Sequence, residues 1–521
     1  MVLNLSLLLL LLLTTAVLVV SATSTSTSLT TTTTIIPTPS SSQLRYQETD
    51  FVALIHYNMA TYAKNGDPGC DKTNWNMKAK YATGKTSDPT TFNPASLNIT
   101  QWFDSIIALG ANIAVLTAKH GCGFCLWPTK SKLPNGQPYN YNVWNNATTT
   151  PSYPMDILNE FVNVANRFGV GYGFYYSIMK NFYLCRDFYG SNSCLNEVLD
   201  GQYNVTDEEY ITIVTQHVTE LYTLYGNLTE IWVDSKLLGM EQLMIKYQPQ
   251  AVGGTPFNPT DWCGTESGYP SKDVGNDDIW DTGYGYFGNV SSKQWVPKFC
   301  DPQLFQKTSL WFWEPNQPIR TLTEMIDIYH DIVGRSMVME IAFSINRDGL
   351  IDTNHEILYK QLGNWVTQCY GYPITSITMM RGKEFNLIIP ANVSIDRIMI
   401  QENIIVGQRI RNYTVVAVVG SQSTIIMQTN QQEEVKVVVA KGHSVGRKRI
   451  HLFQEPIVSY GTPWILKLIV HDYIAVPQIK QFAAYSPCVV VVPGEEDESD
   501  DENGNVVTTI RNRAMHDLSQ S

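Results

Sequence analysis

The feature that most constrains the fold is a repeated alternation of short apolar runs with amphipathic helical patterns between residues 44 and 372. The apolar runs are continuous, as in FVALIH at Phe51–His56, which is typical of strands that are covered on both faces. Strands that alternate with helices favour a parallel sheet with crossover helices. The length of this region fits a (β/α)8 barrel with insertions. We therefore predict an α/β fold with a (β/α)8-like barrel over residues 44–372.

The pattern changes after Tyr372, where short β-rich runs separated by turn residues replace the helices. The runs are Glu384–Pro390, Asp396–Gln401, Tyr413–Val419, Val435–Val439, Lys448–Phe453 and Leu466–His471. Many short strands without a helix between them are typical of an antiparallel β-sandwich. We predict such a sandwich for residues 373–488. A chain of 521 residues is long enough for these two folded domains.

The start of the chain predicts a secretory signal and a linker, and its end predicts a disordered tail. A leucine run at Leu7–Leu13, followed by small residues up to Ala22, predicts a secretory signal peptide over residues 1–22. The apolar stretch approaches membrane-spanning length, so an uncleaved anchor is the alternative. Residues 23–43 are almost all Ser and Thr, which predicts a flexible, O-glycosylated linker. Residues 489–521 predict a disordered tail because they carry eight acidic and two basic residues.

Sequons and cysteines agree with passage through the secretory pathway. Seven N-glycosylation sequons lie beyond the signal, at Asn98, Asn146, Asn204, Asn227, Asn289, Asn392 and Asn412. Nine cysteines are normal for a large secretory enzyme, and we expect Cys185 to pair with Cys194 across a Gly/Ser/Asn loop. Cys122 and Cys125 have the spacing of a thiol redox or metal site, but no second pair accompanies them. We expect the protein to be extracellular or in a lysosome-like compartment.

The charge distribution argues against a nucleic-acid partner. The net charge is −12, and the eight acidic and two basic residues of the tail account for −6 of it. The remaining body is mildly acidic and has no basic stripe. We expect no nucleic-acid partner, and no membrane association unless the signal is uncleaved.

One carboxylate stands where a barrel would place its chemistry. Asp234 ends the apolar run of GNLTEIWVDS, and the carboxyl ends of barrel strands carry the active site. Three other proposed strands end in His56-Tyr57, Lys119-His120 and Tyr175-Tyr176. Each residue alone has a structural explanation, and Asp234 alone could be a helix cap. Together, at four strand ends, they favour an active site.

Motifs for other chemistries are missing or misplaced. No G-x-S-x-G elbow and no H-E-x-x-H metal motif occur in the sequence. The one G-x-G-x-x-G match, Gly283–Gly288, follows no strand and opens no helix, so it does not predict a dinucleotide site. We therefore expect no cofactor and no metal. Histidine, tyrosine, tryptophan and carboxylates without a cofactor suit glycoside hydrolysis, where two carboxyl groups carry the reaction.

Several segments resemble the retaining α-L-fucosidases of glycoside hydrolase family 29, particularly the plant-like branch. They are ALIHYNMATY (53–62), NPASLNITQWFDSIIALGANIAVLTAKHGCGFCLWPTKSK (93–132), GVGYGFYYS (169–177), LYGNLTEIWVDS (224–235), DWCGTESGYP (261–270) and DIYHDIVGRS (327–336). The string K-H-x-x-G-F-C-L-W-P is highly specific. The resemblance covers about residues 45–370. It continues more weakly into residues 395–415, which are similar to the family's galactose-binding-like sandwich.

The resemblance implies a catalytic pair. Asp234 matches the family's nucleophile, and Glu266 in W-C-G-T-E-S-G looks like the acid/base of the plant-like branch. The implied reaction is double displacement on α-L-fucosyl linkages of fucosylated oligosaccharides or glycoproteins. His56 and His120 match histidines that bind fucose hydroxyls. Trp127 matches a residue of the pocket wall, and Tyr175 matches a tyrosine beside the nucleophile.

The sequence also departs from the family pattern. The family often has W-x-P-x-E-C-D, and Phe299 occupies the glutamate position in Trp295–Asp301. The Trp-Asp expected after Tyr-x-Ser is Met179-Lys180, and Ser235 replaces a glycine. These changes lie on the leaving-group side, so altered aglycone specificity is one interpretation. A catalytically impaired fucose-binding glycoprotein is the alternative from another functional class, and a different exo-glycosidase specificity is a third.

Overall fold

The computed structural model describes residues 35–62, 89–144, 153–186, 198, 201–307, 310–419 and 435–488. The predicted signal peptide, most of the predicted linker and the acidic tail lie outside the described residues, as do Asn146 and Cys194. Within the described part of the chain, no helix has the length and apolar character needed to cross a bilayer.

The first described helix begins inside the segment that we predicted to be a flexible linker. Helix α1 spans Ser41–Glu48, and Ser40 caps it through a capping box with Gln43. The Gln43 amide then donates hydrogen bonds to the carbonyls of Pro259 and Trp295, far along the chain. The Ser/Thr-rich composition predicted a linker. Serine is also a favoured helix N-cap residue, so composition alone could not reveal this helix. The end of the predicted linker is therefore ordered.

The predicted barrel is confirmed: eight parallel strands form one sheet in the order β5-β4-β3-β2-β1-β8-β7-β6. The strands are β1 (Phe51–His56), β2 (Ile113–Lys119), β3 (Gly171–Tyr176), β4 (Glu230–Val233), β5 (Val252–Gly253), β6 (Asp261–Trp262), β7 (Lys298–Cys300) and β8 (Val338–Ser344). A parallel bridge between Gly253 and Pro259 nearly closes the ring at the β5–β6 seam.

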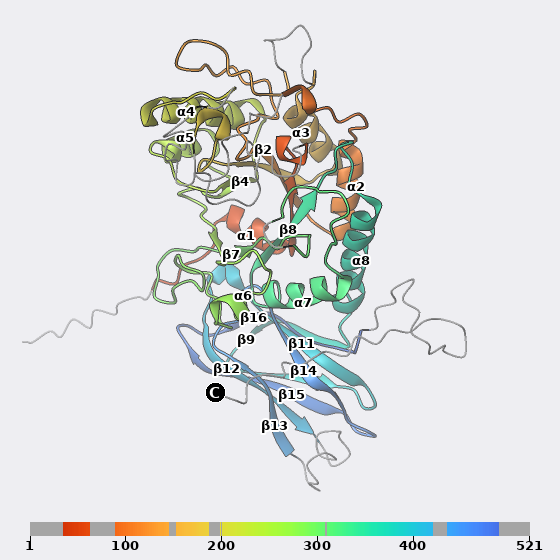
Figure 1. The fold of residues 1–521 in the computed structure, drawn as a ribbon. Coiled ribbons are helices and arrows are strands. Elements are labelled where there is room, and N and C mark those ends of the chain that lie inside the picture. Colours follow the sequence, from red (N-terminus) through yellow and green to blue (C-terminus); the bar gives the residue numbers. More distant parts are fainter. Residues whose placement is uncertain are drawn as a thin grey trace, which may run out of the picture. The chain divides into compact units, whose positions relative to one another are not determined.

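Helices connect the strands and lie outside the ring (Figure 1). They are α2 (Ile99–Leu109), α3 (Ile157–Phe168), α4 (Asp207–Leu224), α5 (Met240–Tyr247), α6 (Pro270–Val274), α7 (Leu322–Ile332) and α8 (Thr353–Tyr370). Residues 254–260, all described, join β5 to β6 without a helix. Capping boxes at Thr206 and Thr321 start α4 and α7, and Gly110 and Gly169 end α2 and α3 in the left-handed conformation.

A buried pair of carboxyl groups lies on two strands of the barrel. Glu230 on β4 and Glu340 on β8 are both completely buried. Glu340 accepts hydrogen bonds from the Tyr46 hydroxyl of α1 (2.5 Å) and the Trp232 indole (3.0 Å). Burial raises the pKa of Glu230 well above its usual range, and the adjacent Glu340 charge raises it further. Glu230 therefore keeps its proton to a higher pH than an exposed glutamate does.

We expect Glu230→Gln to remove a pH dependence of stability. The folded protein keeps a proton on Glu230 that the unfolded chain loses above the ordinary glutamate pKa of about 4.3. Between that value and the raised folded pKa, the free energy of unfolding of wild type should fall by about 1.4 kcal/mol per pH unit relative to the variant. Urea unfolding at several pH values between 5 and 8 measures this difference. Parallel curves for the two proteins would contradict a protonated Glu230.

The C-terminal antiparallel sheets that we predicted are also confirmed. One sheet has the order β10-β15-β12-β13 and the other β14-β11-β16-β9. The strands are β9 (Thr375–Arg381), β10 (Glu384–Ile389), β11 (Ser394–Glu402), β12 (Ile410–Val419), β13 (Val435–Gly442), β14 (Arg449–Val458), β15 (Trp464–Tyr473) and β16 (Gln478–Tyr485). Burial alternates along β10 and β12, as expected for strands with one face on a core. A Cys369–Cys488 disulfide joins the end of α8 to the segment after β16.

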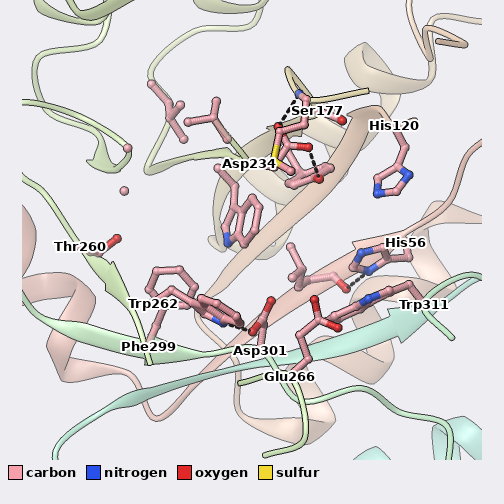
Figure 2. Close-up of a pocket in the computed structure, with 18 of the residues that line it drawn as sticks. His56, His120, Ser177, Asp234, Thr260, Trp262, Glu266, Phe299, Asp301 and Trp311 are labelled. Atoms are coloured by element: carbon pink, nitrogen blue, oxygen red, sulfur yellow. Dashed lines mark hydrogen bonds between the residues drawn. The ribbon is translucent and has the colours of Figure 1, made fainter. Parts of the chain in front are cut away.

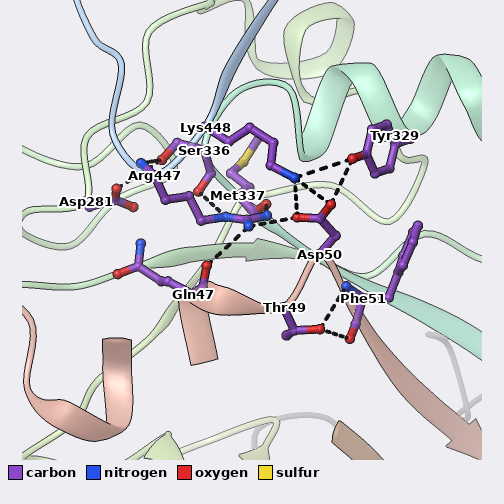
Figure 3. A network of polar contacts seen from close by, with 10 residues as sticks. All are labelled: Gln47, Thr49, Asp50, Phe51, Asp281, Tyr329, Ser336, Met337, Arg447 and Lys448. Carbon is purple, nitrogen blue, oxygen red and sulfur yellow. Dashed lines mark hydrogen bonds and ion pairs between the residues drawn. The ribbon is translucent and has the colours of Figure 1, made fainter. Parts of the chain in front are cut away.

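A network of ionic hydrogen bonds joins the sandwich to the barrel (Figure 3). The Asp50 carboxylate, just before β1, accepts from Arg447 (2.9 Å), Lys448 (2.6 Å) and the Tyr329 hydroxyl (2.8 Å). Arg447 also donates to the carbonyls of Gln47 and Met337. Although burial alone would raise the pKa of Asp50, the Lys448 and Arg447 charges outweigh burial and lower it. The loop before β14 is thereby fixed to the amino end of the barrel strands.

Candidate active site

A cavity of about 450 Å³ lies at the carboxyl ends of the barrel strands (Figure 2). Five of the six predicted site residues line it: His56, His120, Tyr175, Asp234 and Glu266. The sixth, Trp127, is not among the lining residues. The cavity also extends to the β5–β6 seam, where Gly253, Gly254 and Thr260 form its wall.

Asp234 is held in place by three hydrogen bonds. It follows β4, and its Oδ1 accepts from the backbone N–H groups of Ile178 (2.6 Å) and Met179 (3.0 Å). Its Oδ2 accepts from the Tyr175 hydroxyl (3.1 Å). The next helix, α5, is capped by Gly239, so the helix-cap explanation for Asp234 is wrong. The hydrogen bonds come from the loop after β3 and fix the carboxylate in the cavity.

The buried Lys119 binds the loop after β3 through two of its carbonyl groups. The Lys119 ammonium donates to the carbonyl groups of Ser177 and Lys180, which flank the two N–H donors to Asp234. Burial lowers the pKa of Lys119 to about 8, although the Asp234 charge acts in the opposite direction. Through these two hydrogen bonds Lys119 holds the loop after β3.

The two histidines are neutral and stand against aromatic rings. His56 stacks on Trp311, with ring centroids 4.6 Å apart, and His120 stacks on Tyr175 at 5.3 Å. Burial lowers the pKa of His56 to about 3 and also lowers that of His120, which lies near the cationic Lys180 and Lys119. The His56 Nδ1 donates to the Leu54 carbonyl (3.3 Å), which leaves Nε2 as an acceptor. Neutral imidazoles of this kind can bind sugar hydroxyl groups.

Two further carboxyl groups lie across the cavity from Asp234. Figure 2 shows Asp234 on the upper side and Glu266 and Asp301 on the lower side. Glu266 accepts from the Gln303 amide (3.0 Å), and Asp301 accepts from the Trp262 indole (2.6 Å). Burial raises the pKa of both groups, and the Glu266 charge raises that of Asp301 further. A carboxyl with a raised pKa can hold a proton for transfer.

Sequence reasoning missed Asp301 as a site residue. It follows β7, which has only three residues and is too short for a strand to be recognised from its pattern. Its position at a strand end, two residues after Phe299, was the available signal. Trp262 and Trp311 were missed for the same reason, since β6 has two residues and Trp311 lies in a loop.

Phe299 forms part of an apolar wall. It pairs in register with Trp262 on β6, and its ring lies 6.2 Å from that of Trp232 on β4. Only 7% of Phe299 is exposed. The position where the family often has a carboxylate is therefore an aromatic surface of the cavity.

Trp127 and the GCGFC segment have structural surroundings. Trp127 is fully buried, donates to Glu220 on α4 (2.7 Å) and packs edge-on against His217 (5.2 Å). Cys122 is disulfide-bonded whereas Cys125 is a free, buried thiol, so the two do not form a disulfide with each other. Cys185 is also disulfide-bonded, and its predicted partner Cys194 lies outside the described residues. Among described residues, no group of three His, Cys, Asp or Glu side chains could hold a metal.

A parallel barrel that brings carboxyl groups to opposite sides of a pocket walled by aromatic rings and neutral histidines defines a glycoside hydrolase. The family described as Alpha-L-fucosidase matches residues 42–371, which is more than half of the chain. The chain therefore belongs to the α-L-fucosidase family.

Relatives of known sequence and structure agree with this assignment. "Alpha-L-fucosidase 1" of Arabidopsis thaliana is 27% identical over 339 residues, which cover 60% of this chain and 57% of that protein. "Putative alpha-L-fucosidase 1" of Oryza sativa subsp. japonica is 25% identical over 503 residues, which cover 86% and 85%. A crystal structure from Bacteroides thetaiotaomicron, described as a putative alpha-L-fucosidase, superposes with a TM-score of 0.69 at 27% identity. That match covers 87% of this chain and 99% of the other.

Proposed function

We propose that this chain is a retaining exo-glycosidase that releases L-fucose from α-L-fucosyl linkages of glycans or glycoproteins. The observation that carries the proposal is the fixed position of Asp234, which three hydrogen bonds hold at one side of the cavity. A carboxyl of raised pKa, Glu266, stands at the other side. Membership of the α-L-fucosidase family supports fucose as the sugar.

The proposed first step forms a covalent intermediate. Asp234 attacks the anomeric carbon of fucose and forms an ester bond, while the bond from that carbon to the leaving oxygen breaks. Glu266 gives its proton to that oxygen, so the aglycone leaves as a neutral alcohol. His56 and His120 hold fucose hydroxyls during this step, and Tyr175 orients the nucleophile.

The proposed second step releases fucose. Glu266, now a carboxylate, removes a proton from water, and the water oxygen attacks the anomeric carbon. The ester bond to Asp234 breaks, and Asp234 leaves as a carboxylate that again accepts the hydrogen bonds of Tyr175, Ile178 and Met179. Two inversions restore the original anomeric configuration. Raising the pKa of Glu266 by burial favours the protonated form that begins the cycle.

We also propose that the protein passes through the secretory pathway, to the outside of the cell or to a lysosome-like compartment. All six sequon asparagines within the described residues are exposed: Asn98, Asn204, Asn227, Asn289, Asn392 and Asn412. The Cys263–Cys300 and Cys369–Cys488 disulfides agree with an oxidising compartment. Exposed asparagines are available to the glycosylation machinery.

Time-resolved proton NMR of 4-nitrophenyl α-L-fucoside hydrolysis tests the proposed function. We expect α-L-fucose to appear first and the β anomer to grow only by mutarotation. Early β-L-fucose would contradict double displacement. Binding of L-fucose without any turnover would instead support the catalytically impaired alternative.

A further inference from the structure

A glycine-rich loop at residues 283–288 presents two exposed tyrosines beside the cavity. Its sequence, GYGYFG, gave the G-x-G-x-x-G match that did not predict a dinucleotide site. Tyr284 is 52% exposed and Tyr286 is 49% exposed. Tyr286 contacts Trp262, and Trp262 lines the cavity, so the loop lies beside the cavity wall.

The loop is fixed to the cavity wall by Asp261, which itself lines the cavity. The Gly285 N–H donates to Asp261 Oδ2 (2.7 Å), and the buried Lys298 ammonium donates to the same oxygen (3.0 Å). Lys298 also donates to the Gly283 carbonyl (2.7 Å). These contacts set the position of the loop relative to β6 and β7.

The orientation of Tyr286 is determined by a glycine. A Cβ atom at Gly264, just after β6, would come within 2.8 Å of the Tyr286 ring. The ring can pack there only because Gly264 has no side chain. The ring also meets Trp262 edge to face, with centroids 6.0 Å apart. One side of Tyr286 is therefore packed against the barrel, while about half of the residue remains open to solvent.

Tyr286 continues an aromatic surface that begins at the proposed nucleophile. Tyr175, whose hydroxyl donates to Asp234, has its ring 4.6 Å from that of Trp232, and the Trp232 ring lies 6.2 Å from that of Phe299. Phe299 pairs in register with Trp262, which contacts Tyr286. Phe299 is essential to this continuity, because a carboxylate in its place would interrupt the apolar wall.

We propose that Tyr286, with Tyr284 beside it, binds the sugar that is attached to fucose in an oligosaccharide substrate. This inference rests on the proposed function of the cavity, and it identifies the leaving group of the substrate as a sugar. The C–H face of a pyranose packs on an aromatic ring, and Tyr286 offers such a ring at the end of the aromatic surface. A pre-oriented ring loses little freedom when it binds.

Two fucosyl donors that differ only in the leaving group test the proposal. α-L-Fucosyl fluoride has a single leaving atom that does not reach Tyr286, whereas a neutral fucosylated trisaccharide places a sugar there. We expect Tyr286→Ala to lower kcat/KM for the trisaccharide about three- to tenfold and to leave the fluoride unchanged. Tyr286→Phe keeps the ring and should retain both rates. Tyr460→Ala removes a tyrosine of similar exposure, 46%, on the sandwich and should also retain both.

The outcomes separate this inference from the proposed function. A wild-type protein that hydrolyses neither donor would refute the proposed function itself. A wild-type protein active on both, with Tyr286→Ala equally active on the trisaccharide or equally impaired on both donors, would refute the aglycone site alone. Tyr286→Phe keeps the ring that packs on Trp262 and should keep the melting temperature of wild type, and the rates of Tyr286→Ala are measured at a temperature where it is folded.

Discussion

Replacing Asp234 with asparagine is expected to lower kcat for 4-nitrophenyl α-L-fucoside by roughly four orders of magnitude or more, while fucose binding is retained. The reason is that the amide cannot form the glycosyl ester, whereas its oxygen can still accept from Ile178 and Met179. Initial rates and calorimetric titration with L-fucose measure the two quantities. Asp234→Asn is the matched variant because it preserves shape and the loop contacts.

Azide provides the control for this prediction. With Asp234→Ala, azide can enter the space of the missing carboxylate and attack the anomeric carbon directly. We expect restored release of 4-nitrophenol and a β-L-fucosyl azide product, because only one inversion occurs. If Asp234→Asn keeps a rate within tenfold of wild type, Asp234 is not the nucleophile.

Replacing Glu266 with alanine should have an effect that depends on the leaving group. A fucosylated oligosaccharide needs protonation of its leaving oxygen, so we expect a loss in kcat/KM of about 10²–10⁴-fold. 4-Nitrophenolate leaves without a proton, so the loss for its fucoside should be much smaller in the first step. Burial raises the pKa of Glu266, so wild-type activity should fall as pH rises through that raised value. The variant should lose this alkaline limb.

Asp301 is the alternative to Glu266 for the acid/base role. The Asp301→Asn variant distinguishes the two residues. Asp301→Asn can keep the hydrogen bond from Trp262 and should preserve the pocket. We expect it to retain the alkaline limb and the normal dependence on the leaving group. The opposite result, an unaltered Glu266→Ala and a leaving-group-dependent Asp301→Asn, would transfer the role to Asp301.

The sequence predicted the barrel and the residues at the ends of its long strands. β1 and β2 have six and seven residues, so their apolar runs were recognisable and pointed to His56 and His120. The resemblance to the family led to Glu266, because no long strand precedes it. Asp301 follows a three-residue strand, so no periodic pattern announced it. Sequence patterns are informative in proportion to the length of the element that carries them.

Trp127 shows where closeness in sequence is misleading. It follows His120 by seven residues, yet the chain turns back after β2, since the Leu126 N–H donates to the Ala118 carbonyl (3.0 Å). This turn carries Trp127 to Glu220 and His217 of α4, not into the cavity. The contact partner lies some ninety residues away and could not be inferred from the local pattern.

The ion pairs of Asp50 have a consequence for how such proteins can be recombined. Asp50 belongs to the barrel and its two cations, Arg447 and Lys448, belong to the sandwich. Breaking a buried pair by removing one partner costs about 3–5 kcal/mol, because the remaining charge is left without compensation. A chimera that grafts this barrel onto a foreign C-terminal module must therefore import both cations or neutralise Asp50. For such a graft the barrel and its sandwich form one unit, although the chain looks divisible at residue 372.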